Sequence, residues 1–358
     1  MESTQTRPSG SSAERSDDGA GNSADAVTLA GALSEGLLIL DGAMGTELDA
    51  RGVPTAQELW SALALLTAPE AVAAVHDSYL RAGARVLTTI SYQAALPALM
   101  RAGLSEPEAR GAIASSARIA LETAERFSQE RPGRAALVAG SLGPYGAYLA
   151  DGSEYTGAYA LHAPDFEAVH IPRIEELAGQ GIRLFAVETQ PRLDEAQWIV
   201  RRLGDLVPDA ECWVSFQVRP DGRHLADGSA LAAAAAWAQD NGTVSAVGLN
   251  CVAPQVVTRA LPVLGAVTSK PLVAYPNSGD VYDPVTKTWR TVEGAERFTA
   301  SAQGWIDAGV RLLGGCCRTS PADTAVLAGI VAASRRAGLA RRSARSPPRG
   351  WPLTAAAG

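Results

Sequence analysis

The chain has 358 residues but lacks any long apolar segment. Its longest uninterrupted apolar run covers residues 230–238, far short of the ~18 residues that a membrane-spanning helix needs. Residues 1–30 also lack the basic segment followed by an apolar one that marks a secretory signal. These absences argue against an exported or membrane-spanning protein and favour a cytoplasmic one.

Cysteine is scarce as well, with four residues in the whole chain. So few cysteines do not make a disulfide scaffold, and two of them, Cys316 and Cys317, are adjacent, which is poor spacing for a structural bridge. Free thiols in a reducing cytoplasm are the simpler interpretation.

The net charge of −7 is unevenly distributed. Residues 1–25 carry five acids and two arginines, whereas residues 335–358 carry six arginines and no acid. The segment between them is therefore more acidic than the whole chain, which argues against a nucleic-acid-binding body. The basic end lies among Ser, Pro, Gly and Ala, and we expect it to be disordered rather than a phosphate-binding arm. An RNA- or anion-binding role for it is the alternative.

Between the two ends, short apolar runs alternate with Ala-rich amphipathic stretches, the pattern of βα units around a parallel sheet. The chain offers eight such pairs, and no Gly-x-Gly-x-x-Gly turn follows the first strand, so a (β/α)₈ TIM barrel fits better than an open doubly wound sheet. We expect a disordered tail over 1–28, the barrel over 29–336 and a basic disordered tail over 337–358. The predicted strands are 37–40, 86–90, 136–139, 184–187, 212–216, 246–249, 272–274 and 310–313. The predicted helices lie near 55–65, 69–82, 105–128, 165–180, 193–204, 229–240, 254–265, 292–308 and 321–336.

In such a barrel the chemistry lies at the carboxyl ends of the strands, and unusual residues follow the predicted strands there. Cys251 follows the sixth strand, and Cys316 and Cys317 follow the eighth, so the three thiols can converge. Adjacent cysteines share one ion only if the chain leaves β geometry, and we expect Gly314 and Gly315 to provide that freedom. Three thiolates without a fourth protein ligand describe a catalytic zinc site with one open position.

Simpler interpretations of the cysteines remain. The three could be unrelated core thiols, or Cys316 and Cys317 could form a redox-active vicinal disulfide, which leaves Cys251 without a role. We interpret Cys212, inside a predicted strand, as a small buried hydrophobe.

The four histidines, His76, His162, His170 and His224, have no ligand spacing, and we expect surface or cap roles for them. The site then lacks a general base, so the reaction should not need one. A zinc ion held by three thiolates lowers the pKa of an incoming thiol, which becomes a nucleophile at neutral pH. Its natural electrophile is a methyl group on a cationic sulfur or nitrogen, because the leaving group is then neutral. The residues indicate alkyl transfer to sulfur.

Several segments resemble the zinc-dependent homocysteine S-methyltransferases, a family of (β/α)₈ barrels. The three hallmark motifs match residues 41–48 (DGAMGTEL), 248–251 (GLNC) and 314–319 (GGCCRT). Further matches point to the single-domain branch that takes its methyl group from S-methylmethionine or S-adenosylmethionine, and the similarity covers about residues 36–334. These further matches are residues 91–94 (SYQA), 143–157 (GPYGAYLADGSEYTG), 221–228 (DGRHLADG) and 275–279 (YPNSG).

The resemblance implies that Cys251, Cys316 and Cys317 ligate zinc and that Asp41 and Glu188 hold the substrate's amino group. The backbone N–H groups of the turn from Gly42 through Ala43 to Gly45 are then available to its carboxylate, in keeping with the preference of carboxylates for Gly-rich nests. Ordinary turn, cap or salt-bridge roles are the alternatives for the two acids.

Further candidates lie at the rim. Asn250 is a substrate-binding candidate and Asn277 a donor-binding one, with ordinary turn chemistry as the alternative. Arg318 either stabilises the thiolates or pairs with a carboxylate. The donor-binding candidates Tyr92 and Tyr145, with Tyr148 and Tyr155, could form an aromatic wall for a sulfonium, or simply pack as a loop.

The expected activity is methylation of homocysteine to methionine by a monomer or small homo-oligomer that acts on small molecules, without nucleic acid or membrane. Two alternatives remain: methyl transfer from a betaine-type donor, and a non-catalytic barrel that responds to metal or redox state.

Overall fold

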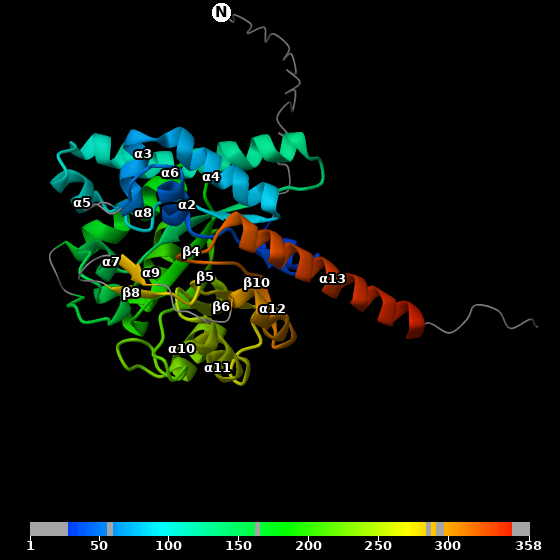
Figure 1. Cartoon of the computed structure of the whole chain (residues 1–358). Helices are drawn as coiled ribbons and strands as arrows, with labels where there is room; N and C mark the ends of the chain where they lie inside the picture. The colour runs from blue at the N-terminus through cyan, green and yellow to red at the C-terminus, as the bar shows by residue number, and fades with distance from the viewer. Residues whose placement is uncertain (1–27, 56–59, 162–164, 284–287, 291–296, 346–358) are drawn as a thin grey trace, which may run out of the picture.

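The computed structural model describes residues 28–55, 60–161, 165–283, 288–290 and 297–345 (Figure 1). Eight parallel strands form one sheet whose order around the barrel follows the order along the chain. The strands are β1 (Leu38–Ile39), β2 (Val86–Thr88), β3 (Leu137–Leu142), β4 (Leu184–Gln190), β5 (Glu211–Phe216), β6 (Val244–Asn250), β7 (Leu272–Tyr275) and β10 (Val310–Leu313). Each coincides with a predicted strand.

The sheet closes on itself between its first two strands. Leu40 and Val86 form a parallel bridge, the Arg85 amide donates to the Ile39 carbonyl at 2.7 Å, and the Asp41 amide donates to the Val86 carbonyl at 3.0 Å. On the other side, β1 pairs with β10. The prediction of a closed (β/α)₈ barrel is confirmed.

Amphipathic helices surround this barrel, as predicted. The α4 and α6 helices cover one side of the molecule and α10 and α11 the opposite side (Figure 1). The predicted helices appear as η1 (Trp60–Leu63) with α3 (Ala64–Thr67), α4 (Pro69–Ala82), α6 (Glu106–Glu130), α8 (Phe166–Gly179), α9 (Leu193–Leu206), α10 (Leu231–Asp240), α11 (Pro254–Gly265), α12 (Phe298–Asp307) and α13 (Pro321–Arg345).

The inside of the barrel is a packed core rather than a channel. Inward-facing residues such as Leu40, Trp213 and Val273 belong to one buried cluster, to which Leu29 also contributes. Leu29 begins α1 (Leu29–Ser34), and its amide donates at 2.6 Å to Glu211, at the start of β5. The α1 helix therefore covers the amino-terminal end of the barrel and leaves the carboxyl ends of the strands for a site.

One glycine in the barrel wall shows how tightly the strands pack. A Cβ at Gly248, in β6, would lie 1.8 Å from the carbonyl oxygen of Val273, in β7. No side chain fits in that space, so the glycine of the GLNC segment is required by a close approach of two strands.

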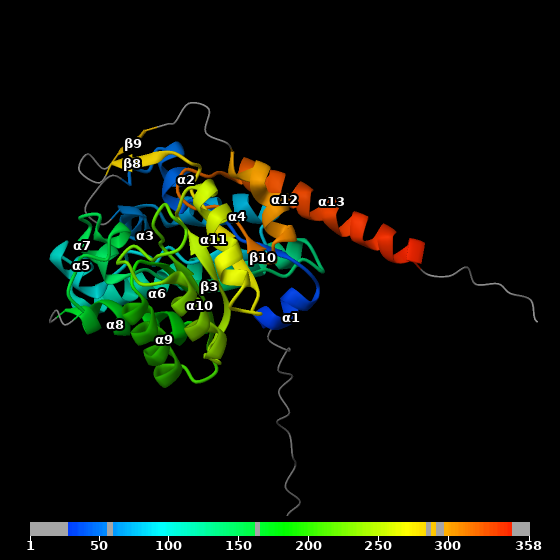
Figure 2. The same ribbon diagram turned by 90° about the horizontal axis from the view of Figure 1, so that it is seen from below.

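Some elements were not predicted from the sequence. They are α1, α2 (Met44–Ala50), α5 (Leu96–Arg101), α7 (Tyr145–Leu149), η2 (Ser153–Tyr155) and a hairpin of β8 (Val281–Asp283) and β9 (Thr288–Arg290). The hairpin and α1 lie at opposite ends of the molecule (Figure 2). The α13 helix runs past residue 336, where we had placed the end of the barrel domain, to Arg345. Residues 337–345 of the tail that we expect over 337–358 are therefore helical, whereas residues 346–358, like residues 1–27 of the other tail, lie outside the described residues. Within the described ranges, no helix is both long and apolar enough to cross a membrane.

The histidine prediction is partly wrong. His224 does lie at an exposed turn, where its Nδ1 is 2.7 Å from Asp221, but His76 and His170 are completely buried. His76 is in α4, and neither of its ring nitrogens has a hydrogen-bond partner. Their apolar neighbours on the helices, not the residue type, determine their burial. His162 lies outside the described residues.

Burial lowers the pKa of His76 from 6.5 to about 4. The unfolded chain therefore takes up a proton at His76 between pH 6.5 and pH 4, whereas the folded chain does not, so the free energy of unfolding falls as the pH drops through this window. The expected loss is at most about 3 kcal/mol. In His76→Leu this component should vanish, which urea denaturation at pH 7 and pH 5 measures. An equal pH dependence in both proteins would contradict the assignment.

Candidate active site

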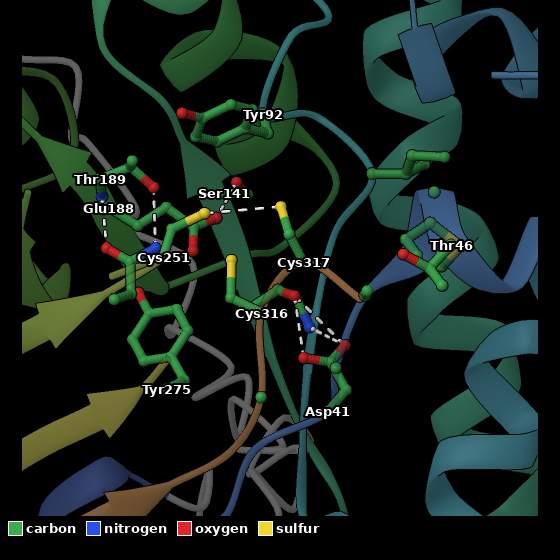
Figure 3. A pocket seen from close by; sticks show the side chains of 18 of the residues that line it. Asp41, Thr46, Tyr92, Ser141, Glu188, Thr189, Cys251, Tyr275, Cys316 and Cys317 are labelled. Atoms are coloured by element: carbon green, nitrogen blue, oxygen red, sulfur yellow. Dashed lines mark hydrogen bonds between the residues drawn. The ribbon is translucent and has the colours of Figure 1, made fainter. Parts of the chain in front are cut away.

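A cavity of about 430 Å³ opens at the carboxyl ends of the strands, where the sequence predicts the site. Its volume is typical of a small-molecule pocket. The segments after β1, β2, β3, β6 and β10 and the last residues of β4 and β7 all contribute to its wall, so residues far apart in the sequence meet there (Figure 3). Among the predicted site residues, those that line it are Asp41, Gly42, Ala43, Gly45, Tyr92, Tyr155, Glu188, Asn250, Cys251, Cys316, Cys317 and Arg318.

The three cysteines converge on one point of this wall. Their sulfurs all lie within 4.8 Å of one another, and those of Cys251 and Cys317 are 3.5 Å apart. Tetrahedral zinc with Zn–S distances near 2.3 Å places sulfurs about 3.8 Å apart. All four cysteines of the chain are free, including Cys212, which is fully buried in β5 as predicted. The thiols are thus near ligand spacing and too far apart for a disulfide, and the structure contains no Cys316–Cys317 bridge.

The backbone reaches this arrangement in a different way from the one expected. Gly314 and Gly315 do not adopt positive φ. Both lie against neighbouring side chains instead: a Cβ on Gly314 would lie 2.6 Å from the Cβ of Leu40, and a Cβ on Gly315 would lie 2.3 Å from Oγ1 of Thr319. These glycines permit close packing rather than an unusual conformation. The positive φ values belong to Cys251 (51°) and Arg318 (66°). Left-handed backbone at such residues is costly and clusters at functional sites.

The three thiols shift one another's pKa values in opposite directions. Hydrogen bonds to Cys251, together with burial, raise the pKa of the Cys316 and Cys317 thiols well above the ordinary value. The same contacts lower the pKa of Cys251. Without a cation, therefore, one thiolate is favoured and the other two thiols keep their protons. A bound divalent ion reverses this, because coordination deprotonates a thiol.

Two buried carboxyl groups accompany the thiols. Asp41 accepts hydrogen bonds from the Thr88 amide at 2.8 Å and from its hydroxyl at 3.0 Å. Burial raises the pKa of Asp41 to about 8 and that of Glu188 to about 7, against hydrogen bonds that lower both. A bound ammonium group would favour the ionised forms, so the two acids suit a cationic ligand group.

A buried hydrogen-bond network holds Glu188 in place. Ser141 donates to its carboxylate, and a hydrogen bond with Tyr275 lowers its pKa. The Tyr275 hydroxyl in turn lies 3.0 Å from Trp213 Nε1 and 2.6 Å from Ser215 Oγ. Since the indole only donates, Tyr275 accepts from it and keeps its own proton for another partner. Side chains of three other strands therefore hold the Glu188 carboxylate in one position.

Asn250 has a structural partner at both ends of its amide. Its Oδ1 accepts from the Thr189 amide at 2.8 Å, and its Nδ2 donates to the Thr189 hydroxyl at 2.7 Å. Thr189 has φ of 57°, so Asn250 stabilises an unusual backbone next to Glu188. Asn250 lines the cavity, but both ends of its side-chain amide are hydrogen-bonded to Thr189, so it stabilises the cavity wall.

Two of the donor-binding candidates lie elsewhere. Neither Tyr145 nor Asn277 is among the described residues that line the cavity. The Tyr145 hydroxyl donates to Asp165, and its ring packs against Tyr148 and other aromatic rings, so loop packing is its role. Asn277 accepts from the Gly279 amide at 2.9 Å in a local turn. Tyr92 does line the cavity.

Arg318 lies at the rim, where its Nε is 3.1 Å from the Asp280 carboxylate. Of its two predicted roles, the structure shows pairing with a carboxylate. Arg318 is the only Lys or Arg among the described lining residues. Four acids also line the cavity, so acidic side chains outnumber basic ones there; they are Asp41, Asp49, Glu154 and Glu188.

The sequence prediction missed Glu154, between β3 and α8, whereas it named the neighbouring Tyr155 as part of a possible aromatic wall. Glu154 and Tyr155 both line the cavity, and the Tyr155 hydroxyl lies 4.0 Å from the sulfur of Cys251. Burial raises the pKa of Glu154 to about 7. The available signal was an acid beside Tyr155 in a segment that matches the family, but Glu154 lies far from a strand end and was not singled out.

Comparisons with known proteins agree with this geometry. The family model for homocysteine S-methyltransferase matches residues 38–331. Homocysteine S-methyltransferase YbgG of Bacillus subtilis is 44% identical over 289 residues, covering 80% of this chain and 91% of its own. Homocysteine S-methyltransferase of Escherichia coli is 45% identical over 293 residues, covering 81% and 94%.

The same similarity extends to solved structures. The metallated form of the homocysteine methyltransferase MmuM from Escherichia coli superimposes with a TM-score of 0.74 at 42% identity, covering 83% of this chain and 98% of that one. The region that the family model matches, residues 38–331, includes every strand of the barrel and all three cysteines of the cluster. The chain therefore belongs to the homocysteine S-methyltransferase family.

Proposed function

We propose that this protein transfers a methyl group from S-methylmethionine, or from S-adenosylmethionine, to the sulfur of L-homocysteine held on Zn²⁺, giving L-methionine. The observation that carries the proposal is the cluster of three free thiols, within 4.8 Å of one another, in the wall of an acidic cavity. That a relative, MmuM, has a metallated form supports a bound metal in this chain.

The donor set of the cluster fits zinc. Sulfur ligands in a nearly tetrahedral spacing are those that zinc prefers, and three protein ligands leave a fourth position for substrate. When bound, zinc lowers the pKa of the homocysteine thiol so that it reacts as a thiolate at neutral pH.

The other residues of the site bind and orient the substrate. Asp41 and Glu188 present carboxylates to the ammonium group of homocysteine, while the turn from Gly42 to Gly45 offers backbone N–H groups to its carboxylate. A sulfonium donor leaves as a neutral thioether, so departure needs no acid. This agrees with the absence of histidine among the described lining residues.

Purified, zinc-loaded protein incubated with homocysteine and each donor tests the function. We expect methionine with S-methylmethionine or S-adenosylmethionine and a faster reaction with one of them. Preference for glycine betaine would assign a betaine-type activity instead. Retained zinc without methionine from any donor would favour a non-catalytic metal- or redox-responsive barrel.

The cellular setting belongs to the same proposal. Free thiols at the site suit a reducing cytoplasm, and the substrates are small molecules rather than nucleic acid or membrane. We expect a monomer or small homo-oligomer, which light scattering of the full chain would establish.

Asp41→Asn tests the binding of the ammonium group. The amide keeps the shape of the carboxylate but loses its charge, so we expect the homocysteine KM to rise about 10- to 100-fold, the loss of one charge-assisted hydrogen bond. Zinc content should stay at one equivalent. The exposed Asp209, paired with Arg183 at the surface, provides the control variant Asp209→Asn, which should leave KM unchanged. An unchanged KM in Asp41→Asn would contradict the assignment.

A further inference from the structure

Glu154 occupies a well-defined place in the cavity wall. It lies in η2, in the loop between β3 and α8, next to Tyr155. The Tyr155 amide bonds the Gly152 carbonyl at 3.0 Å, the Gly157 amide bonds that of Ser153 at 2.7 Å, and Gly152 has φ of 86°. The loop also packs directly on α7, because a Cβ at Gly146 would lie 2.5 Å from the Glu154 amide nitrogen. Glu154 is thus held by rigid backbone.

One oxygen of the Glu154 carboxyl lacks a partner, although backbone hydrogen bonds from Glu154 itself and from Gly152 act on the group and lower its pKa. Glu154 is 94% buried, since only 6% of its surface is exposed, and its Oε2 has no hydrogen-bond partner. Asp41 is bonded to Thr88, Glu188 to Ser141, and Asp49 to both the amide and the hydroxyl of Thr55. A buried, unpartnered carboxyl oxygen is costly unless a ligand supplies a donor or a positive charge.

Of the cationic groups in the proposed reaction, only the sulfonium of the methyl donor has no acidic partner among the residues described so far. The three thiolates face the zinc ion, and Asp41 and Glu188 face the homocysteine ammonium group. The positive sulfur of the methyl donor has no acid assigned to it. Glu154 lines the same wall as Tyr92 and Cys251, and the hydroxyl of its neighbour Tyr155 lies 4.0 Å from the Cys251 sulfur, so Glu154 lies close to the thiol cluster where the proposed transfer takes place.

We propose that Glu154 is the specificity-determining residue for the methyl donor, with its carboxylate facing the sulfonium charge beside the rings of Tyr92 and Tyr155. This inference rests on the proposed function. The carboxylate favours a cationic donor over a neutral or anionic one, and the rings add cation–π attraction.

The chemistry of the transfer predicts which kinetic constant Glu154 controls. The bond between the methyl carbon and the donor sulfur breaks, its electron pair stays on that sulfur, and a lone pair of the homocysteine sulfur forms the new bond. The positive charge on the donor therefore decreases toward the transition state. A carboxylate that faces this charge stabilises the bound donor at least as much as the transition state, so its loss raises the donor KM and leaves kcat nearly unchanged.

The test compares two ligands of the same shape on zinc-loaded protein without homocysteine. S-methylmethionine carries a sulfonium, and 2-amino-5-methylhexanoate has a neutral carbon in its place with the same ammonium and carboxylate groups. We expect calorimetry to show that the wild type prefers the sulfonium and that Glu154→Gln reduces this preference about 10- to 100-fold. In turnover, the S-methylmethionine KM should rise by a similar factor, with the homocysteine KM unchanged.

Two further variants separate the effect of the Glu154 charge from that of side-chain length and net charge. Glu154→Asp retains the charge on a shorter chain and should restore part of the preference. Glu122→Gln removes one exposed acid from α6 and should match the wild type, which controls for net charge. Equal weakening of both ligands, an unchanged preference, lost zinc or homocysteine affinity in Glu154→Gln, or no S-methylmethionine binding by the wild type would each overturn the inference. A wild type that binds S-methylmethionine selectively but forms no methionine would instead contradict the proposed function alone.

Discussion

Cys251→Ser, Cys316→Ser and Cys317→Ser should each lose bound zinc and lower methionine formation by a factor on the order of 10³ or more. The three sulfurs lie within 4.8 Å of one another, and together they form the metal-binding group found among the described His, Cys, Asp and Glu side chains. A serine hydroxyl is a poor zinc ligand, because it does not ionise at neutral pH and zinc prefers soft sulfur. Metal analysis of each purified variant, beside the turnover assay, measures both effects.

The fourth cysteine provides the matched control. Cys212 is completely buried in β5, and burial raises the pKa of its thiol to about 12, so it cannot act as a thiolate. Cys212→Ala should retain a full equivalent of zinc even if it unfolds at a lower temperature. Full zinc stoichiometry in all three cluster variants would rule out the proposed ligation.

The barrel was predictable because its signals are local. Buried strands of a parallel sheet appear as short apolar runs, and their alternation with amphipathic stretches determines the topology. The place of the cysteines, Asp41 and Glu188 in the cavity was predictable for the same reason, since each lies at or within four residues of a strand end and the topology brings strand ends together.

Other parts of the site depend on contacts that no local pattern encodes. Asn250 resembles a free amide at a strand end, yet it is fully bonded to Thr189, a residue 61 positions away. Glu154 enters the cavity through a loop whose course depends on Gly146 and Gly152. Tyr145 lies near Glu154 in the sequence but points toward Asp165. Loop residues are placed by tertiary packing, so their side-chain directions had to come from the structure.

A buried arginine illustrates how far that packing reaches. Arg173, in α8, is completely buried, and its guanidinium donates to the carbonyls of Tyr92 at 2.7 Å and Gly143 at 2.9 Å. It also donates to His170 Nδ1 at 3.0 Å, so the proton of this imidazole must be on Nε2, which lies 3.0 Å from Glu195. One side chain thus joins the loops after β2 and β3, and the first of them carries Tyr92 into the cavity.

Arg173→Met should lower the free energy of unfolding by about 3–5 kcal/mol, because it leaves two buried carbonyls unpaired and removes the positive charge near buried Glu195. Burial lowers the pKa of Arg173 only to about 10, so the lost group is a full charge at neutral pH. Urea denaturation measures the change. Since Tyr92 loses its backbone support, the donor KM should rise while the homocysteine KM stays close to that of the wild type.

Arg81→Met, at the surface, is the matched control for Arg173→Met. Arg81 pairs with Asp77 at 2.6 Å and Glu130 at 3.0 Å, yet exposed pairs contribute only about 0–1 kcal/mol, so Arg81→Met should have little effect. Arg173→Lys should recover only part of the loss, because a single ammonium nitrogen cannot reproduce the planar fork that reaches both carbonyls and His170. Similar losses in Arg81→Met and Arg173→Met would show that the buried hydrogen bonds of Arg173 contribute no more than a surface ion pair. In that case the support of Tyr92 would have to come from elsewhere in the loop.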